Sequence, residues 1–548
     1  MKIPKKGDRY AAQAIKLAYP GKTEAPEIIA GAEPAALRRT KIFGEVGEGE
    51  WHNMIIFGDN IAALKTLLEM KEKGMKNADG SSGVKLIYID PPFGTGDVYG
   101  RGDVGAYSAK LTGARYLEWL RRRIILLREL LCDSGSFYMR IDYHFGHYMK
   151  VLLDEIFGAA QFRNEIVISR TKKIFEGASR FNAATDSVFF YTKSDKYTFN
   201  GFKKKRKAQK WIAMHSPGIR WTEIDEAHLP FYKPGERVER KGRHFSRGRI
   251  FDGKVLFPPE GRHWTFTQER MDKYLAEGRI RLNLKGVLEY LTSAMEIVDS
   301  NWTDIPGYTF KWNYPTENSE QLLERIISAS SDQGDVVLDA FAGAGTTGAV
   351  AEKLKRNWIL MDSSKFSIHT IVSRMLNLKE HIGNGGKALA AKPFALYDLS
   401  SKEGAPMTTD PHQTGFDVVY PPDVESCFYI ERRRGKLSDE FVIKINKFHS
   451  NAFSEESVKG KEGGKRRHGM EALSSVMMDC GYDGECFKMR GRWEAKELEK
   501  NGYEIRIGAE SAGKRMMVVF SDIYGNELKE IKTREDFERG HRLEGGAI

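Results

Sequence analysis

The sequence LIYIDPPFGTG, at residues 86–96, determines the fold prediction for this chain. Four strand-forming residues lead into Asp90, two prolines, an aromatic ring that we expect to be exposed, and a glycine-spaced loop. The prolines cannot donate backbone hydrogen bonds and make this a rigid elbow rather than the start of a helix. Free carbonyl oxygens therefore lie beside one carboxylate and one flat ring, a shape suited to a planar group that carries an amine.

Strand and helix patterns alternate on both sides of the elbow, and they return near residue 319 after a long interruption. Patterns of this kind predict a doubly wound, mostly parallel sheet that is covered by helices on both faces, an α/β fold. Strands are predicted at 53–57, 85–89, 136–142, 164–170, 335–339 and 358–362, and helices at 61–70, 116–131, 148–158, 319–331 and 363–378.

Composition limits the class of protein. The chain has 548 residues, 41% of them hydrophobic, which is enough for two or three domains. Its four cysteines include no CxxC pair, so we predict neither a disulfide framework nor a metal site and expect a reducing cytoplasm. No apolar run approaches the roughly 18 residues of a membrane helix, so no membrane association is expected.

A basic segment interrupts the α/β pattern. Residues 171–254 hold 20 Lys and Arg against 9 Asp and Glu, an excess as large as the +11 of the whole chain. The segment includes KKKRK at 203–207 and many aromatic rings. A charged run is often only a solvated face, but clustered charges interleaved with rings favour a nucleic-acid surface.

A glycine turn follows the returning strand. Gly343, Gly345 and Gly348 match G-x-G-x-x-G, and Asp362 ends the next predicted strand. This context predicts a nucleoside-bearing cofactor whose ribose binds the carboxylate. A nicotinamide oxidoreductase shares the pattern. However, Asp339 just before the turn would repel a pyrophosphate and suits the ammonium of a methionine moiety, and an oxidoreductase gives the elbow no role.

The elbow has a chemical interpretation and a plainer alternative. If the planar group is a nucleobase, Asp90 and the Pro91 carbonyl can accept from its amine while Phe93 stacks on the ring. The base would have to leave the duplex to reach them. No cysteine follows a proline, so the covalent route to cytosine carbon is not indicated. The alternative is a turn that merely ends a strand.

Several stretches together resemble a known family, the β-class amino-methyltransferases of DNA. They are IIFGDNIAALKTLL (55–68), KLIYIDPPFGTG (85–96), MKVLLDEIFG (149–158) and TENSEQLLERIISASSDQGDVVLDAFAGAGTTG (316–348). The order of the motifs most resembles the Mod subunits of type III restriction–modification systems. The resemblance implies a permuted class I S-adenosylmethionine-dependent methyltransferase fold, with a target-recognition region between the two motifs.

The resemblance also implies roles for matched residues. The catalytic elbow would be Asp90, Pro91, Pro92 and Phe93, and the S-adenosylmethionine site would comprise Asp59, Asp339, Phe341, Gly343, Gly345 and Asp362. The acidic elbow favours adenine N6 as the target. Cytosine N4 is the alternative, although its enzymes usually have serine in place of the aspartate. The family more often has Tyr-Asn where this chain has Phe93-Gly94, a change that keeps the stacking ring.

Partners and domains follow from the same resemblance. The implied partners are double-stranded DNA, a restriction helicase–nuclease subunit and a second copy of the chain. A nucleic-acid-binding protein with a degenerate cofactor site is a competing hypothesis. The predicted divisions are a lead-in at 1–50, a catalytic half at 51–170, a target-recognition insertion at 171–304, a cofactor-binding half at 305–380, a linker at 381–420 and a β-rich domain at 421–548.

Overall fold

The computed structural model describes most of the chain. The described residues are 15–47, 49–93, 98–101, 104–108, 111–170, 179, 181–217, 249–256, 258–259, 262–312, 314–400, 424–434, 438–450 and 469–545. They form two compact units, one comprising residues 1–200 and 299–548 and the other residues 201–298. Among the described residues, no helix is both long and apolar enough to cross a membrane.

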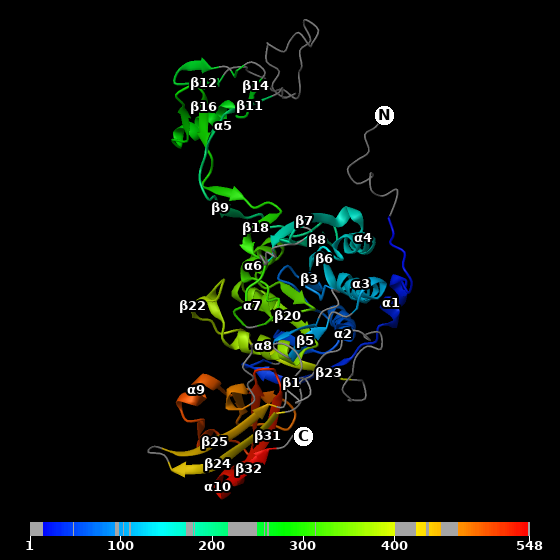
Figure 1. Cartoon of the computed structure of the whole chain (residues 1–548), viewed down its shortest axis with the longest axis vertical. Coiled ribbons are helices and arrows are strands. Elements are labelled where there is room, and N and C mark those ends of the chain that lie inside the picture. The colour runs from blue at the N-terminus through cyan, green and yellow to red at the C-terminus, as the bar shows by residue number, and fades with distance from the viewer. Residues whose placement is uncertain are drawn as a thin grey trace. The chain divides into compact units, whose positions relative to one another are not determined.

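The first unit is organised by an 11-stranded sheet with the order β18-β7-β8-β6-β3-β19-β20-β2-β23-β1-β27 (Figure 1). In that order, the strands are Asn301–Pro306, Phe162–Ser169, Thr185–Thr192, Leu131–Ile141, Val84–Ile89, Val336–Asp339, Asn357–Asp362, Asn53–Phe57, Phe394–Ser400, Ala36–Phe43 and Phe487–Lys488. Every neighbouring pair from β6 across to β23 is parallel. The central strands are buried along their length because both faces of the sheet are covered.

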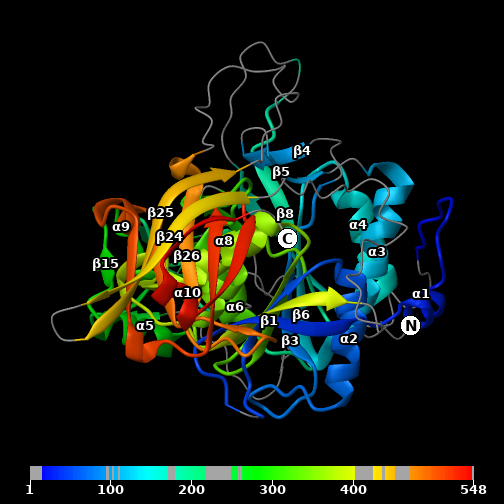
Figure 2. The ribbon, with the colours of Figure 1, turned by 90° about the horizontal axis from the view of Figure 1, so that it is seen from below.

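Helices cover the sheet on both faces. Figure 2 shows α2 (Asn60–Glu72), α3 (Gly113–Leu130) and α4 (Gly146–Phe157) together on one side, with α6 (Glu320–Ser330) and α8 (Lys365–Leu376) on the other. Helix α7 (Thr346–Lys353) packs with α6, and α1 (Ala25–Gly31) packs on α3. The predicted doubly wound, mostly parallel α/β fold of class I methyltransferases is confirmed.

Three predicted divisions differ from the observed strands. The lead-in at 1–50 contains β1 and the linker at 381–420 contains β23, and the two strands pair in the sheet. The insertion predicted at 171–304 is too long, because β8 and β18 pair with β7 in the sheet. Strand β1 has a largely solvent-facing first half, and the apolar β23 follows an Ala- and Lys-rich stretch that is typical of a linker.

The second unit, residues 201–298, has its own small core of Met214, Trp264, Phe266, Met271, Ile280 and Leu288. Its elements are β9 (Lys203–Lys205), β10 (Trp211–Ala213), β11 (His215–Pro217), β12 (Arg249–Phe251), β13 (Lys254–Leu256), β14 (Arg262–Trp264), α5 (Gln268–Ala276), β15 (Ile280–Leu282), β16 (Leu288–Leu291) and β17 (Met295–Ile297). Phe251 packs against this core, so that ring of the basic segment has a structural role. The rings at Phe175, Trp221, Phe231, Tyr232 and Phe245 lie outside the described residues.

The C-terminal region is β-rich, as predicted. Two four-stranded sheets, β29-β25-β24-β32 and β28-β26-β30-β31, enclose a core that includes Phe428, Val476 and Phe520. Its elements are β24 (Val424–Arg434), β25 (Asp439–Ser450), β26 (Leu473–Asp479), β28 (Gly491–Glu494), α9 (Ala495–Lys500), β29 (Glu504–Gly508), β30 (Arg515–Asp522), β31 (Glu527–Thr533), α10 (Arg534–Arg539) and β32 (His541–Gly545). Hairpins β4–β5 (Val98–Arg101, Val104–Ser108) and β21–β22 (Lys379–His381, Gly385–Ala388) belong to the rest of the first unit.

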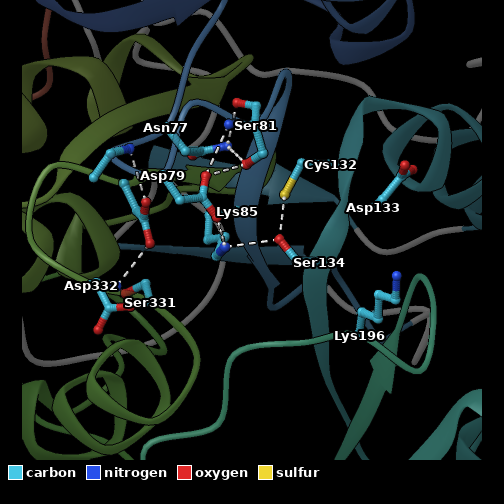
Figure 3. Close-up of polar contacts among 12 residues, drawn as sticks. Asn77, Asp79, Ser81, Lys85, Cys132, Asp133, Ser134, Lys196, Ser331 and Asp332 are labelled. Carbon is cyan, nitrogen blue, oxygen red and sulfur yellow. Dashed lines mark hydrogen bonds and ion pairs between the residues drawn. The ribbon is translucent and has the colours of Figure 1, made fainter.

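A polar cluster fastens the amino ends of β3, β6 and β19 (Figure 3). The Lys85 ammonium is buried and donates to Asp79 Oδ2 at 2.6 Å and to Ser134 Oγ at 2.8 Å. Asn77 Oδ1 accepts from the Val336 N–H at 3.0 Å and thereby ties the same loop to β19. The hydrogen bond from Lys85 is the largest cause that lowers the pKa of Asp79 to about 2.

We expect Asp79→Asn to destabilise the protein at pH 7 by about 1 kcal/mol, because Lys85 loses its charged partner while Asp79 is half exposed to screening solvent. The Asp79 pKa is depressed in the folded state, so this contribution is present above about pH 4 and is lost as the pH falls through about 2. Urea unfolding of the wild type and of Asp79→Asn between pH 7 and pH 3 measures how the difference between their free energies of unfolding shrinks. The exposed Asp133→Asn is the control, and a difference that does not change with pH would contradict the assignment.

Candidate active site

The elbow and the glycine turn lie at the same edge of the sheet. Strands β3 and β19 are parallel neighbours, with Leu86 opposite Val337 and Ile87 opposite Leu338. Asp339 therefore ends β19 beside Tyr88, and Asp90 follows the carboxyl end of β3. In open α/β sheets this edge, at the point where the strand order reverses, is where ligands bind. The sequence places these motifs far apart, and the fold brings them together.

The Asp90 carboxylate has a defined environment. Asn318 Nδ2 donates to Asp90 Oδ2 at 2.8 Å. Burial raises the pKa of Asp90 to about 6, while the Arg140 guanidinium and the Asn318 hydrogen bond act in the opposite direction. The carboxylate is therefore mostly ionised near neutral pH, and it is held where few water molecules compete for its free lone pairs.

The rest of the elbow differs in one respect from expectation. Pro91 is buried and Pro92 is half-buried, as a rigid turn at the sheet edge requires. Phe93 was expected to be exposed, and that expectation is wrong. The ring is 8% exposed and belongs to the same hydrophobic cluster as Leu111 and Tyr116. Burying an apolar ring against the core is more favourable in free energy than leaving it in water. The stacking of Phe93 on a base stays a prediction.

Two carboxylates frame the glycine turn. Asp339 Oδ1 accepts from the Phe341 N–H at 2.9 Å, and the Thr347 hydroxyl donates to Asp339 Oδ2. Asp362, at the end of β20, accepts from the Gly343 N–H at 2.9 Å and from the Ser364 N–H at 2.9 Å. Burial raises the pKa of Asp339 to about 7 and that of Asp362 to about 6. Both acids therefore favour a cationic or hydroxyl-bearing ligand.

The glycines of the turn are required by geometry. Gly345 has φ +72° and begins α7, and a Cβ there would lie 2.9 Å from Ile371 Cγ1. At Gly348 a Cβ would lie 2.6 Å from Leu360 Cδ1, so the third glycine permits close packing of α7 on β20. These close contacts require glycine at both positions, so that α7 can pack against β20 and α8.

Asp59 orders the wall of the site. Its carboxylate caps α2 by accepting from the Ile61 N–H at 2.8 Å and forms a 2.8 Å ion pair with Arg123. Arg123 is fully buried and stacks on Trp119, whose ring centroid lies 5.6 Å from that of Phe341. Asp59 is thereby linked to the glycine turn through packed side chains, and direct contact with a cofactor stays a prediction.

The sequence analysis did not identify three residues near Asp90, which are Arg140, Asp186 and Asn318. Arg140 is fully buried in β6, pairs with Asp186 of β8 at 2.6 Å, and donates to Asn318 Oδ1 at 2.6 Å. Arg140 gave a detectable signal, since it is a charged residue within the apolar FYMRI run of β6, whereas Asp186 lies between Thr185 and Ser187 at the polar start of β8. Asn318 carried no such signal, because an asparagine in a polar loop is common.

The fold, with the elbow and the glycine turn on neighbouring parallel strands, is that of an S-adenosylmethionine-dependent methyltransferase. The chain belongs to the DNA methylase family of N6 and N4 methyltransferases, whose family model matches residues 84–373. It is similar to the type II methyltransferase M.EcaI of Enterobacter cloacae, with 33% identity over 380 residues that cover 66% of this chain and 77% of the relative.

Two further comparisons are more distant. The probable type III restriction–modification enzyme HindVI Mod subunit of Haemophilus influenzae is 24% identical over 393 residues, which cover 59% of this chain and half of that relative. The crystal structure of the M1.HpyAVI–SAM complex matches at 18% identity and a TM-score of 0.29, covering 59% of this chain and 99% of that chain.

S-adenosylmethionine is the cofactor of this chain, and the donor set of the turn fits it. The buried Asp339 carboxylate suits an ammonium, because a cation favours its charged form in a site where burial opposes that form. Asp362 keeps lone pairs for hydroxyls beyond the two N–H groups that it already accepts. When bound, the cofactor supplies an electrophilic methyl group on a sulfonium.

We expect the affinity for S-adenosylhomocysteine, which carries the same ammonium, to rise with pH through about 7. Below that pH, Asp339 is protonated and the affinity should fall by at most about tenfold per pH unit. Asp339→Asn should bind more weakly at pH 8 and show a flatter profile. Calorimetric titration between pH 5.5 and 8.5 measures both, and a profile that is unchanged in Asp339→Asn would contradict this role.

Proposed function

We propose that this protein transfers a methyl group from S-adenosylmethionine to the N6 amine of an adenine in double-stranded DNA. The observation that carries the proposal is the adjacency of β3 and β19, which sets the amine-accepting elbow beside the cofactor turn. The acidic character of the elbow supports adenine over cytosine. Cytosine N4 is the second candidate, because the family includes enzymes of both kinds.

The elbow acts by accepting hydrogen bonds. The amine of a nucleobase is a poor nucleophile because its lone pair is delocalised into the ring. Asp90, with one oxygen held by Asn318, can accept from that amine and favour a more tetrahedral nitrogen. The N–C bond then forms as the S–C bond breaks, positive charge passes to the nitrogen, and the nitrogen releases a proton that the Asp90 carboxylate can take.

The position of Asp90 beneath the surface supports base flipping. A base paired within a duplex cannot reach a carboxylate at the edge of a buried sheet, so the target nucleotide must leave the stack. Direct transfer to an amine needs no covalent enzyme intermediate, so the hydrogen-bond acceptors of the elbow can serve without a nucleophilic thiol. A neutral, rigid backbone at Pro91 and Pro92 would fix the acceptors before the base arrives.

We expect the purified protein to transfer labelled methyl groups to duplex DNA, and Asp90→Ala to slow that transfer at least about 100-fold, because the charge-stabilising acceptor is lost. Asp133→Asn is the matched acidic control. Enzymatic digestion of the product identifies the base. N6-methyladenine supports the proposal, N4-methylcytosine selects the second candidate, and full activity of Asp90→Ala would contradict the role of the elbow.

We further propose that the unit at residues 201–298 contacts the DNA target. It contains the KKKRK run at 203–207, in which Lys203, Lys205 and Lys207 are exposed. Lys204 and Arg206 of the same run instead pair with Glu296 at 3.9 and 3.0 Å. The run therefore divides into residues that hold the β9–β17 ribbon together and residues that face the solvent, which are suited to phosphate contacts.

We expect the triple variant K203A/K205A/K207A to bind duplex DNA more weakly and with a smaller salt dependence. Each lost phosphate contact should lower the slope of log K against log salt by roughly 0.9. Fluorescence anisotropy across a salt series measures the slope. The control K496A/K500A/K514A removes equal charge from the exposed surface of the C-terminal region. An equal decrease in the slope of log K against log salt in both triple variants would contradict a specific role for the KKKRK run.

We propose that this protein works as the modification component of a restriction–modification system. Support comes from relatives named as Mod subunits of type III systems, about half of whose length this chain matches. A restriction helicase–nuclease subunit and a second copy of the chain are the partners that this setting implies. Co-purification with the product of a neighbouring ATPase–nuclease gene, with the mass of the complex measured by light scattering, tests both.

A further inference from the structure

Asn318 lies in the segment between β18 and α6 and contacts both halves of the site. Its side chain donates to Asp90 Oδ2 at 2.8 Å, and its main-chain carbonyl accepts from the Thr346 hydroxyl at 3.2 Å. Thr346 is the first residue of α7, directly after the glycine turn. Arg374 donates to both Thr346 Oγ1 and the Ala344 carbonyl, at 2.9 and 3.2 Å, so the cofactor side of this link is itself fastened.

The orientation of the Asn318 amide is determined by its neighbours. Its Oδ1 accepts from the Tyr88 hydroxyl at 3.1 Å and from Arg140 Nη1 at 2.6 Å. Both are donors toward that atom, so the oxygen must face them and the NH₂ group must face Asp90. Arg140 is in turn held by Asp186, by the Gly307 carbonyl at 3.0 Å and by the ring of Tyr308 at 3.7 Å.

We propose that Asn318 is a positioning residue that orients the Asp90 carboxylate and keeps it ionised for the target amine. This inference rests on the proposed function of Asp90. With Oδ2 held by the amide, the other carboxylate oxygen is left to accept from the base. A hydrogen bond donated to the charged form favours that form, and it counters the desolvation that Asp90 undergoes beside a buried sheet.

Other charged and titratable groups also act on Asp90, and the Asn318 effect has to be measured against them. They are Tyr88 on β3, Tyr116 on α3, Arg140 on β6, Arg170 after β7, Asp186 on β8, Tyr308 after β18, and Asp339 on β19. Arg140 and Arg170 favour the carboxylate, whereas Asp186 disfavours it. Asn318→Ala leaves all of these residues in the chain, but it removes three side-chain hydrogen bonds, the one donated to Asp90 and the two accepted from Tyr88 and Arg140.

Two substitutions separate positioning from a merely structural role. Asn318→Ala removes the donated hydrogen bond, which should raise the pKa of Asp90. Asn318→Asp keeps the shape, accepts from Arg140 and Tyr88, and places a second carboxylate against Asp90. Like charges at that distance should raise the pKa further. Neither variant changes the main-chain carbonyl that accepts from Thr346.

The experiment measures single-turnover methyl transfer to duplex DNA from pH 5.5 to 9 for the wild type and both variants. We expect the acid limb of the rate profile to move upward by roughly one pH unit in Asn318→Ala and by more in Asn318→Asp. The Asn318→Ala rate should be about fivefold low at pH 6 and should recover most of the loss by pH 8.5. The affinity for S-adenosylhomocysteine should stay within about twofold of wild type.

The outcomes that overturn the inference differ from those that overturn the proposed function. A loss that is equal at every pH, or an acid limb that does not move, would make Asn318 structural and contradict the positioning role. A wild-type protein that transfers no methyl group would instead contradict the proposed function. Thermal unfolding checks that each variant folds, and if Asn318→Ala fails this check, the isosteric Asn318→Asp alone carries the test.

Discussion

The parallel pairing of β3 with β19 is the constraint on which the site depends. It places the carboxylates of Asp90 and Asp339 at one edge of a buried sheet, where burial raises the pKa of both and the Asp90 carboxylate further raises that of Asp339. Such an arrangement is unfavourable for folding unless other groups favour the charged forms. A ligand that carries an ammonium and a sulfonium would neutralise the negative charge of these two carboxylates.

Buried arginine side chains supply much of the positive charge that favours ionised carboxylates in this region. Arg140 and Asp186 are both fully buried, and Arg140 reaches Asp90 through Asn318. On the cofactor side, Arg374 pairs with Glu320 at 2.9 Å while it holds the turn at Ala344 and Thr346. Removing one partner of such a buried pair costs about 3–5 kcal/mol, so these ion pairs link the stability of the fold to the geometry of the site.

The sequence predicted the layered fold and the two motifs at one sheet edge well, because both depend on local patterns. The strand that ends in Asp90 and the turn from Gly343 to Gly348 each carry their own signature. Prediction failed where tertiary packing decided the outcome. Phe93 looked exposed because it follows two prolines, yet it packs into the core, and β23, whose FALY residues are apolar, was assigned to a linker because of the Ala- and Lys-rich stretch before it. Asn318 acquires its role only from neighbours that the fold supplies.

A structure of the protein bound to S-adenosylhomocysteine tests the central claim most directly, which is that the elbow and the turn serve a single transfer. We expect the ammonium of the ligand at Asp339, its ribose at Asp362, and its sulfur facing the Asp90 side of the sheet edge. A ligand bound in a cavity that does not open toward Asp90 would contradict the claim.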